Sequence, residues 1–567
     1  MKGKRCRTED KICLLREADL HEGFLTKAIA SLVRIMLLKP RAIFVMPNSN
    51  HSLFKRCFTL WLLFLVSSGL ANGTNSLRFE IRMVSGLVDE AQTGRMIVVL
   101  SRNDKPEPRL IVTSTGRNAP CVLACDVDKL TPGVATVLDQ HAIICPVNNL
   151  AELSGGDYSV QALLDSNNGS CVPNSPGNFY SDVQKFHLDP SQGGTIQLWL
   201  AHRIPDELLP PDTALVKFVK IQSRLLSQFH GRPVYLRAGI ILPRDYDRES
   251  ERKYPILVRI GGYGTRYSTV NSLMAEKSSF RKVWLADETP RMIVLQLDGE
   301  GPYGDPFQIN SANNGPFGDA VTQELIPYVE SQFRAFGRPS ARVLSGGSTG
   351  GWAALALQVY YPDFFNGVWS FCPDPVDFRA FELVNLYSDD NAYVNQYGFE
   401  RPSERTVEGE VRLTLRSELQ IENVLGCGDC WTMSGCDWCA WNALFGPRAA
   451  DGHPAVPWNP KTGVIDHQVA EGWKNHDLRL VMQQNWKIIG LKLQGKLHIA
   501  VGDADNYYLN NAVHLLDDFL SQANPPYKGR ITFGLGKGHG WQDVDLGKML
   551  DEMEAAHEQP GDAAHGF

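Results

Sequence analysis

One short stretch of the chain holds a serine in a setting that could support covalent chemistry. The sequence G-G-S-T-G at residues 346–350 follows the apolar pair Val343 and Leu344 and precedes a helix-forming run, residues 352–360. Gly-x-Ser-x-Gly between a strand and a helix is typical of a nucleophile elbow. Glycines are needed there because strand and helix approach closely and the hydroxyl of Ser348 must stand clear. The alternative is a glycine-rich turn without chemistry.

A serine hydroxyl is a weak nucleophile, so it needs a base, and the base needs an orienting carboxylate. His539 lies between two glycines, directly after an expected strand at residues 530–534. Asp505 follows another expected strand, residues 497–501. Asp503 is the alternative acid, but the first aspartate after a strand commonly caps the turn. The order Ser348, Asp505, His539, each after a strand, is typical of the α/β-hydrolase fold and predicts a catalytic triad.

Such a reaction also needs two backbone N–H groups to stabilise an oxyanion. The residue after the serine, Thr349, is expected to provide one of them. The second is expected from Gly262 or Tyr263, in the glycine turn 261–264 that follows the apolar segment 254–260. An ordinary turn is the alternative, but its place two strands ahead of Ser348 favours the oxyanion hole.

The elements that would position these residues fall into two regions. Residues 75–204 contain short strand-like segments separated by turn-rich joints, which predicts a small antiparallel β-sandwich. A proline-rich joint at residues 204–212 marks the boundary. In residues 214–557 strands alternate with helices, and the first two strands are expected to pair antiparallel. This predicts a mixed, mostly parallel sheet with helices on both faces.

The N-terminal part of the chain looks like a targeting segment. Residues 1–56 hold twelve Lys and Arg against five Asp and Glu, so the net charge of −7 leaves −14 on the remainder. The basic pair 55–56 precedes an apolar run, residues 57–66, and small residues that suit cleavage after Ala71. We therefore expect residues 1–71 to be an extension and signal peptide, with Met46 as the expected natural start. An uncleaved membrane anchor is the alternative.

Charge and cysteine content bear on partners and compartment. An acidic body argues against a nucleic-acid surface. Beyond the expected signal, four cysteines lie in the first region, four lie between residues 427 and 439, and Cys372 stands alone. Two sets of four favour disulfides in a secreted or periplasmic protein, without a stable membrane span in the mature form, and Cys372 is expected to be a buried thiol.

The expected α/β region is interrupted by about a hundred residues, 377–476. Paired C-x-x-C motifs within it suggest either two disulfides or a tetrahedral zinc site, and the short five-residue spacer favours disulfides. Its cysteines are Cys427, Cys430, Cys436 and Cys439. The insertion is also rich in tryptophan, and we expect Trp438 and Trp441 to bind substrate. About half of the tryptophans there are expected to be core.

Several motifs together carry a family resemblance from about residue 236 to residue 544. They lie at 239–243, 254–255, 261–262, 314–319, 324–328, 346–351, 361–365, 502–505 and 538–540. The chain resembles the putative esterase family of α/β-hydrolases, which includes enterochelin esterases, S-formylglutathione hydrolases and feruloyl esterases. The resemblance implies ester hydrolysis without a metal or organic cofactor. It also implies Ser348 as nucleophile, Asp505 as acid and His539 as base. A preceding β-sandwich is similar to enterochelin esterases in architecture only.

The sequence thus predicts a secreted serine hydrolase that cleaves a small-molecule or glycan carboxylic ester through an acyl-enzyme. A serine peptidase or an acyltransferase on the same fold is the alternative among enzymes, since acyl transfer needs only an alcohol that outcompetes water. A binding protein on an inactive hydrolase fold is the alternative outside enzymes. The oligomeric state is left open.

Overall fold

A computed structural model describes residues 76–116, 118–166 and 169–558. The expected extension and signal peptide, residues 1–71, lie outside these residues. No helix in the described part of the chain is both long enough and apolar enough to cross a membrane.

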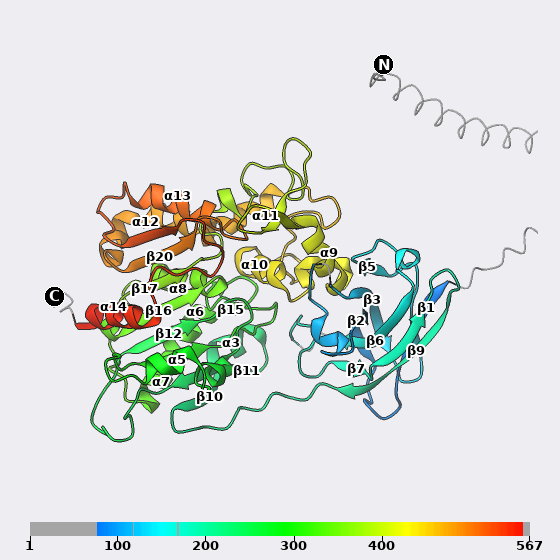
Figure 1. Cartoon of the computed structure of the whole chain (residues 1–567), viewed down its shortest axis with the longest axis horizontal. Helices are drawn as coiled ribbons and strands as arrows, with labels where there is room; N and C mark the ends of the chain where they lie inside the picture. Colours follow the sequence, from blue (N-terminus) through cyan, green and yellow to red (C-terminus); the bar gives the residue numbers. More distant parts are fainter. Residues whose placement is uncertain (1–75, 117, 167–168, 559–567) are drawn as a thin grey trace, which may run out of the picture. The chain divides into compact units, whose positions relative to one another are not determined.

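The first region, coloured blue to cyan in Figure 1, contains a nine-stranded β-sheet. The strand order is β4-β1-β9-β7-β6-β2-β3-β5, with β8 also paired to β6. Its strands are β1 (Leu77–Met83), β2 (Gln92–Ser101), β3 (Cys121–Leu130), β4 (Ala135–Leu138), β5 (Ile143–Cys145), β6 (Gly156–Asp165), β7 (Phe179–Ser181), β8 (Gln184–Leu188) and β9 (Gly194–Arg203). Alternate residues of β1, β2, β6 and β9 share one apolar core, so the sheet curls around its own interior. The prediction that the strands of this region are antiparallel is wrong for one pair, because β1 and β9 run parallel.

The second region is built on an eight-stranded sheet in the order β10-β11-β13-β12-β16-β17-β20-β21. Its strands are β10 (Val216–Ser223), β11 (Val234–Ile241), β12 (Ile256–Ile260), β13 (Ile293–Leu297), β16 (Arg342–Gly347), β17 (Val368–Phe371), β20 (Leu497–Gly502) and β21 (Arg530–Gly534). The β10–β11 and β11–β13 pairs are antiparallel and the other pairs are parallel. The predicted mixed, mostly parallel sheet is confirmed.

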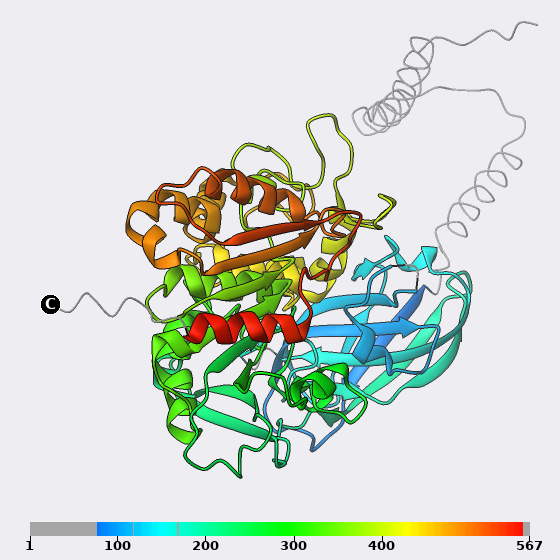
Figure 2. The ribbon, with the colours of Figure 1, turned by 60° about the vertical axis from the view of Figure 1, so that its left-hand side comes forward.

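Helices cover both faces of this sheet, which is why its central strands are apolar on both sides. One face packs against α7 (Ile326–Gln332), α8 (Thr349–Tyr360), α12 (Leu478–Leu493) and α13 (Asn510–Leu520). The other packs against α5 (Ser279–Trp284) and α14 (Leu546–Glu558), the red helix of Figure 2. Between β13 and β16 the chain forms α6 (Phe317–Ala320), a π-helical turn (Val321–Leu325) and α7.

Residues 377–476 lie between β17 and α12 and contain most of the remaining elements. These are β18 (Pro402–Arg405), β19 (Val411–Thr414), α9 (Leu415–Leu425), α10 (Asp437–Phe445) and α11 (His467–Gly472), with short 3-10 turns. We call this segment the insertion. The apolar side chains of Ile421, Val424 and Leu425 on α9 share a core with β2 and β3 of the first region. The insertion therefore packs against the nine-stranded sheet.

Candidate active site

Ser348 lies at the sharp turn between β16 and α8. Its backbone has φ 57° and ψ −129°, a conformation that a residue with a side chain adopts only under strain. Steric crowding explains why glycines stand on both sides of Ser348. A Cβ atom on Gly350 would lie 2.2 Å from the carbonyl oxygen of Gly261, and one on Gly346 would lie 2.0 Å from that of Gly350. The turn therefore tolerates no side chains at these two positions.

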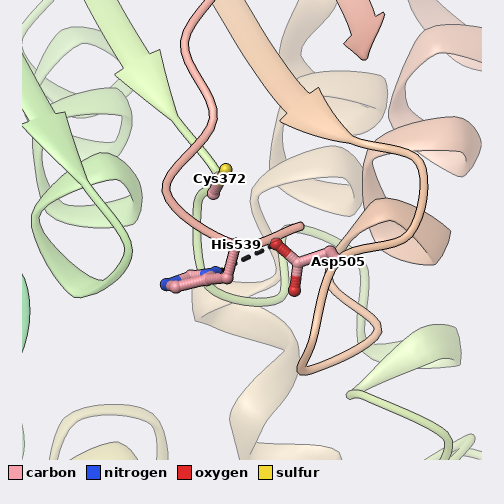
Figure 3. Close-up of side chains that lie close together, drawn as sticks. All are labelled: Cys372, Asp505 and His539. Atoms are coloured by element: carbon pink, nitrogen blue, oxygen red, sulfur yellow. Dashed lines mark hydrogen bonds and ion pairs between the residues drawn. The ribbon is translucent and has the colours of Figure 1, made fainter. Parts of the chain in front are cut away.

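His539 and Asp505 meet at the carboxyl ends of β21 and β20. The Nδ1 atom of His539 is 2.9 Å from Oδ2 of the fully buried Asp505 (Figure 3). Asp505 also accepts the N–H of Tyr507 at 2.9 Å, which fixes the carboxylate. Because Nδ1 is bound to Asp505, Nε2 of His539 remains available for proton exchange. The alternative acid, Asp503, instead accepts the N–H of Gly536, so Asp505 is the carboxylate at this imidazole.

The environment of His539 favours its protonated form. Burial acts to lower its pKa, but the hydrogen bond and charge of Asp505, with a further contribution from Asp374, raise the pKa above its ordinary value. Ser348 and His539 line the same cavity. Among the described residues no hydrogen bond joins the Ser348 hydroxyl to His539. Such contacts commonly tighten when substrate binds.

The structure brings the predicted oxyanion turn beside the serine. A Cβ atom on Gly262 would lie 3.7 Å from Cβ of Ser348. The turn is held by the buried Asp305, which accepts the N–H of Gly264 at 3.1 Å. The hydroxyl of Tyr263 donates to the carbonyl of Gly435 at 2.8 Å, which ties the turn to the insertion. Thr349 is the first residue of α8, where helix N–H groups point outward.

Asp374 is a site residue that the sequence did not indicate. It lies after β17, is buried, and its Oδ2 accepts the Thr349 hydroxyl at 3.1 Å and the Trp441 indole N–H at 2.8 Å. Burial raises its pKa to about 6, against the effect of the Trp441 hydrogen bond. Its only sequence signal is a carboxylate after a strand, a signal that it shares with Asp503 and Asp505.

Cys372 is buried, as expected, and also lies beside Asp505 and His539. Its Sγ is one of three donor atoms, with those of Asp505 and His539, that lie within 4.8 Å of one another (Figure 3). The thiol donates to the carbonyl of Trp541 at 3.4 Å. Burial raises its pKa to about 11, so it remains protonated at neutral pH. Cys372 is therefore a packing residue beside Asp505 and His539 and a poor nucleophile.

Ser348 and His539 open into a cavity of about 850 Å³. The insertion lines much of it, and the first region contributes a wall that includes residues 172–176. Trp441 lies in the lining, as expected of a substrate-binding residue. Trp438 does not: it is buried in an aromatic cluster with Trp458, at a ring distance of 5.6 Å. The structure thus places one of the two predicted tryptophans at the cavity.

The cysteines of the insertion behave differently from the expectation. The structure has no disulfide among the cysteines it describes. Cys439 instead donates to the carbonyl of Thr432 at 3.1 Å, and the Cys430 sulfur lies 3.2 Å from the Thr432 hydroxyl. Nor do these cysteines form a set of metal ligands, since the only such group among described residues is the one at Cys372. The cysteine spacing predicts two disulfides or a zinc site, and the structure supports neither.

Comparisons with known proteins bear on the family of this chain. No curated protein matches the sequence. Solved structures similar in fold include a ferulic acid esterase (13% identity, 60% of this chain and 99% of the other, TM-score 0.36). Others are an S-formylglutathione hydrolase from Agrobacterium tumefaciens (13%, 62% and 98%, 0.33) and one from Staphylococcus aureus (14%, 60% and 98%, 0.32).

The family comparison is more specific. The model of the family described as "Putative esterase" matches residues 235–527, more than half of the chain. This stretch holds β11 to α13, and with them Ser348, Asp505 and the oxyanion turn. The predicted resemblance is confirmed: the chain belongs to the putative esterase family and is a carboxylic ester hydrolase.

Proposed function

We propose that this esterase hydrolyses small-molecule carboxylic esters through Ser348, His539 and Asp505 by way of an acyl-enzyme. The observation that carries the proposal is the placement of Ser348 and His539, which follow two strands of one sheet and line one cavity. A strained serine at the end of β16 faces the same cavity as an imidazole whose Nδ1 is held by a buried carboxylate. That arrangement leaves one basic nitrogen and one hydroxyl available to a bound ester.

The reaction follows from these positions. The Ser348 hydroxyl attacks the ester carbonyl while Nε2 of His539 takes its proton. The resulting oxyanion accepts hydrogen bonds from the N–H of Thr349 and from Gly262 or Tyr263. The tetrahedral intermediate then collapses: its C–O bond breaks, His539 returns the proton to the departing alcohol, and the acyl group stays on Ser348. Water, deprotonated by His539, then attacks the acyl carbon; the C–O bond to Ser348 breaks, His539 returns the proton to the Ser348 oxygen, and the acid leaves. Asp505 stabilises the imidazolium in both halves.

A fluorophosphonate probe and a p-nitrophenyl butyrate assay test this proposal together. We expect wild type to be labelled once per chain. Ser348→Ala is expected to lose labelling and about 10⁴-fold or more in kcat/KM. Ser331→Ala, a change at an exposed serine, is the matched control and keeps both. Labelling or substantial hydrolysis that survives in Ser348→Ala would show that another residue is the nucleophile.

A further inference from the structure

The cavity in front of Ser348 is lined by far more acidic than basic side chains. Its carboxylates are Asp206, Glu207, Glu300, Asp305, Asp374, Glu382, Glu404, Glu418, Glu422 and Asp437. The lining holds one guanidinium, Arg266, and the imidazole of His539. Arg266 is already paired with Asp298, Glu207 and Glu300. The carboxylates deeper in the insertion therefore have no lysine or arginine of the lining to balance them.

Some of these carboxylates have a structural task. Glu422 accepts the Ser434 hydroxyl at 2.7 Å and the N–H groups of Trp438 and Cys439 at 3.0 and 3.1 Å, so it caps the start of α10. Asp305 and Asp374 hold the oxyanion turn and Thr349, as described above. Hydrogen bonds of this kind account for the burial of these three groups without any ligand.

Glu382 and Asp437 have no such task. Glu382 is only 3% exposed and lines the cavity, and its Oε2 atom has no hydrogen-bond partner in the described part of the chain. Asp437 also lines the cavity, and its buried Oδ1 atom likewise has no partner among described residues. A buried polar atom without a partner is costly, and native proteins rarely keep one without a reason.

Electrostatics sharpen this imbalance. Burial raises the pKa of Glu382 well above its ordinary value, and the charges of Glu418, Asp374, Asp505 and Asp437 raise it further. Burial raises the pKa of Asp437 in the same way, and the charges of Glu422 and Glu418 raise it further. The groups that face these two carboxylates are thus other carboxylates. A positive charge among them would reduce the repulsion between the carboxylates and offset the free-energy cost of burying them in ionised form.

The geometry favours an organic cation over a metal ion. Among described residues no three carboxylates bring oxygen atoms within 4.8 Å of one another, so no ready set of ligands for a divalent ion is present. The cavity is instead wide, and the aromatic side chains of Tyr263, Trp441 and Tyr507 line it. Aromatic faces attract ammonium groups, and a primary ammonium has three N–H donors for unpartnered carboxylate oxygens.

We propose that the ester substrate carries a primary ammonium group, which binds in the insertion at Glu382 and Asp437. The inference rests on the proposed function, because it places that group in the cavity that Ser348 shares. It assigns to the insertion the choice of substrate: the triad sets the reaction, and the two unpartnered carboxylates select a positively charged ester.

Pairs of esters that differ only in charge test this inference. In each pair a terminal ammonium replaces a methyl group of the same size: p-nitrophenyl 6-aminohexanoate against p-nitrophenyl heptanoate, and 6-aminohexyl butyrate against heptyl butyrate. The first pair places the charge on the acyl side and the second on the alcohol side. We expect kcat/KM to favour the ammonium ester of at least one pair by about tenfold or more, as for a desolvated charge pair.

Variants of the two carboxylates locate the effect. Glu382→Gln and Asp437→Asn keep the size of the side chain and remove its charge, and each is expected to abolish most of the preference for the ammonium ester. Glu408→Gln, a change at an exposed glutamate of the same insertion, keeps it. Titration with the fluorophosphonate probe gives the fraction of folded, active protein in each sample. If one variant does not fold, the other decides.

The outcomes separate this inference from the proposed function. Wild type that labels and hydrolyses the neutral esters but shows no preference in either pair overturns the ammonium site and leaves the proposed function standing. A preference that survives in both carboxylate variants also overturns the site. Calcium binding in calorimetry that is lost in Glu382→Gln, without any ammonium preference, would assign these carboxylates to a metal instead. Failure of the probe to label wild type would contradict the proposed function itself.

Discussion

At the scale of single residues, the protonation of His539 decides when the proposed mechanism can operate. Its imidazole lies near two carboxylates, Asp505 in direct contact and Asp374 beside Thr349. Burial lowers the pKa of the ring, but the two negative charges outweigh burial, and the net direction is upward. A base must be neutral to accept the serine proton. As the pH falls, a raised pKa therefore causes activity to be lost at a higher pH than it would be for an isolated imidazole.

The acid limb of the pH profile should therefore lie above the ordinary histidine value of about 6.5. We expect kcat/KM for p-nitrophenyl butyrate to rise with pH through this raised midpoint. Asp374→Asn should move the midpoint to lower pH, because it removes a charge that raises the His539 pKa while an amide oxygen can still accept a hydrogen bond from Trp441. The measurement is the pH dependence of kcat/KM between about pH 5 and 9.

A change at an exposed carboxylate serves as the control for this shift. Glu408→Gln removes an exposed carboxylate of the insertion and should leave the midpoint where it is in wild type. A midpoint that moves upward in Asp374→Asn, or stays fixed, would show that Asp374 does not act on the imidazole.

At the scale of elements, the strand ends were predictable and the contacts between distant segments were not. Ser348, Asp505 and His539 each follow an apolar strand, and parallel strands bring their carboxyl ends to one edge of a sheet. Local pattern is enough for that inference. The parallel β1–β9 pair joins segments more than a hundred residues apart, and hydrophobic alternation contains no information on such a pairing.

The insertion shows the same limit. Trp438 and Trp441 lie three residues apart on α10, and their rings are in contact at 4.7 Å. Spacing alone gives them the same face of the helix, yet only Trp441 reaches the cavity, since Trp438 is covered by Trp458 and Phe381. The cysteine pattern failed likewise, because a disulfide depends on Cβ geometry that sequence spacing does not fix.

The elbow itself supplies a prediction about elements. Gly350→Ala would place a methyl group against the carbonyls of Gly261 and Ile260 and push α8 away from β12. Because this shift moves Ser348 relative to the oxyanion turn, we expect kcat to fall about 100-fold. The free energy of unfolding should fall by about 1–3 kcal/mol, as for an overpacked core. Steady-state kinetics and urea unfolding measure the two effects.

Gly347→Ala is the matched change in the same turn. A Cβ atom there would meet nothing closer than the carbonyl oxygen of Phe371 at 3.7 Å, an ordinary contact. Its losses in kcat and in stability should both be clearly smaller than those of Gly350→Ala. Equal losses in the two variants would mean that the close packing of α8 against β12 is not the reason why position 350 requires glycine.

At the scale of the whole described molecule, the site is shared by three parts of the chain. The eight-stranded sheet positions Ser348 and His539, the insertion contributes acidic side chains and Trp441, and residues 172–176 of the first region close one side. The first region is fixed to the insertion by a shared apolar core and by one buried cation. That cation is Arg95 on β2, which is 1% exposed.

Arg95 bridges the two parts, because it pairs with Asp126 at 2.8 Å and with Asp429 at 2.7 Å and donates to the carbonyl of Val424 at 3.0 Å. Arg95→Ala removes all three bonds and leaves the buried carbonyl unpaired. We expect a loss of about 2–4 kcal/mol in the free energy of unfolding, since the partner carboxylates are half-exposed and can regain water. Urea unfolding measures this loss.

The same change should act on the cavity, because α9 carries both the Arg95 contact and the apolar residues that pack on β2 and β3. Amide hydrogen exchange over residues 415–425 should become faster in Arg95→Ala, and kcat/KM should fall more for a bulky ester than for p-nitrophenyl acetate. Arg78→Ala breaks an exposed pair with Glu80 and should change stability by less than about 1 kcal/mol. Unchanged exchange in α9 of Arg95→Ala would mean that the apolar core alone holds the insertion, and that the cavity wall does not depend on the buried cation.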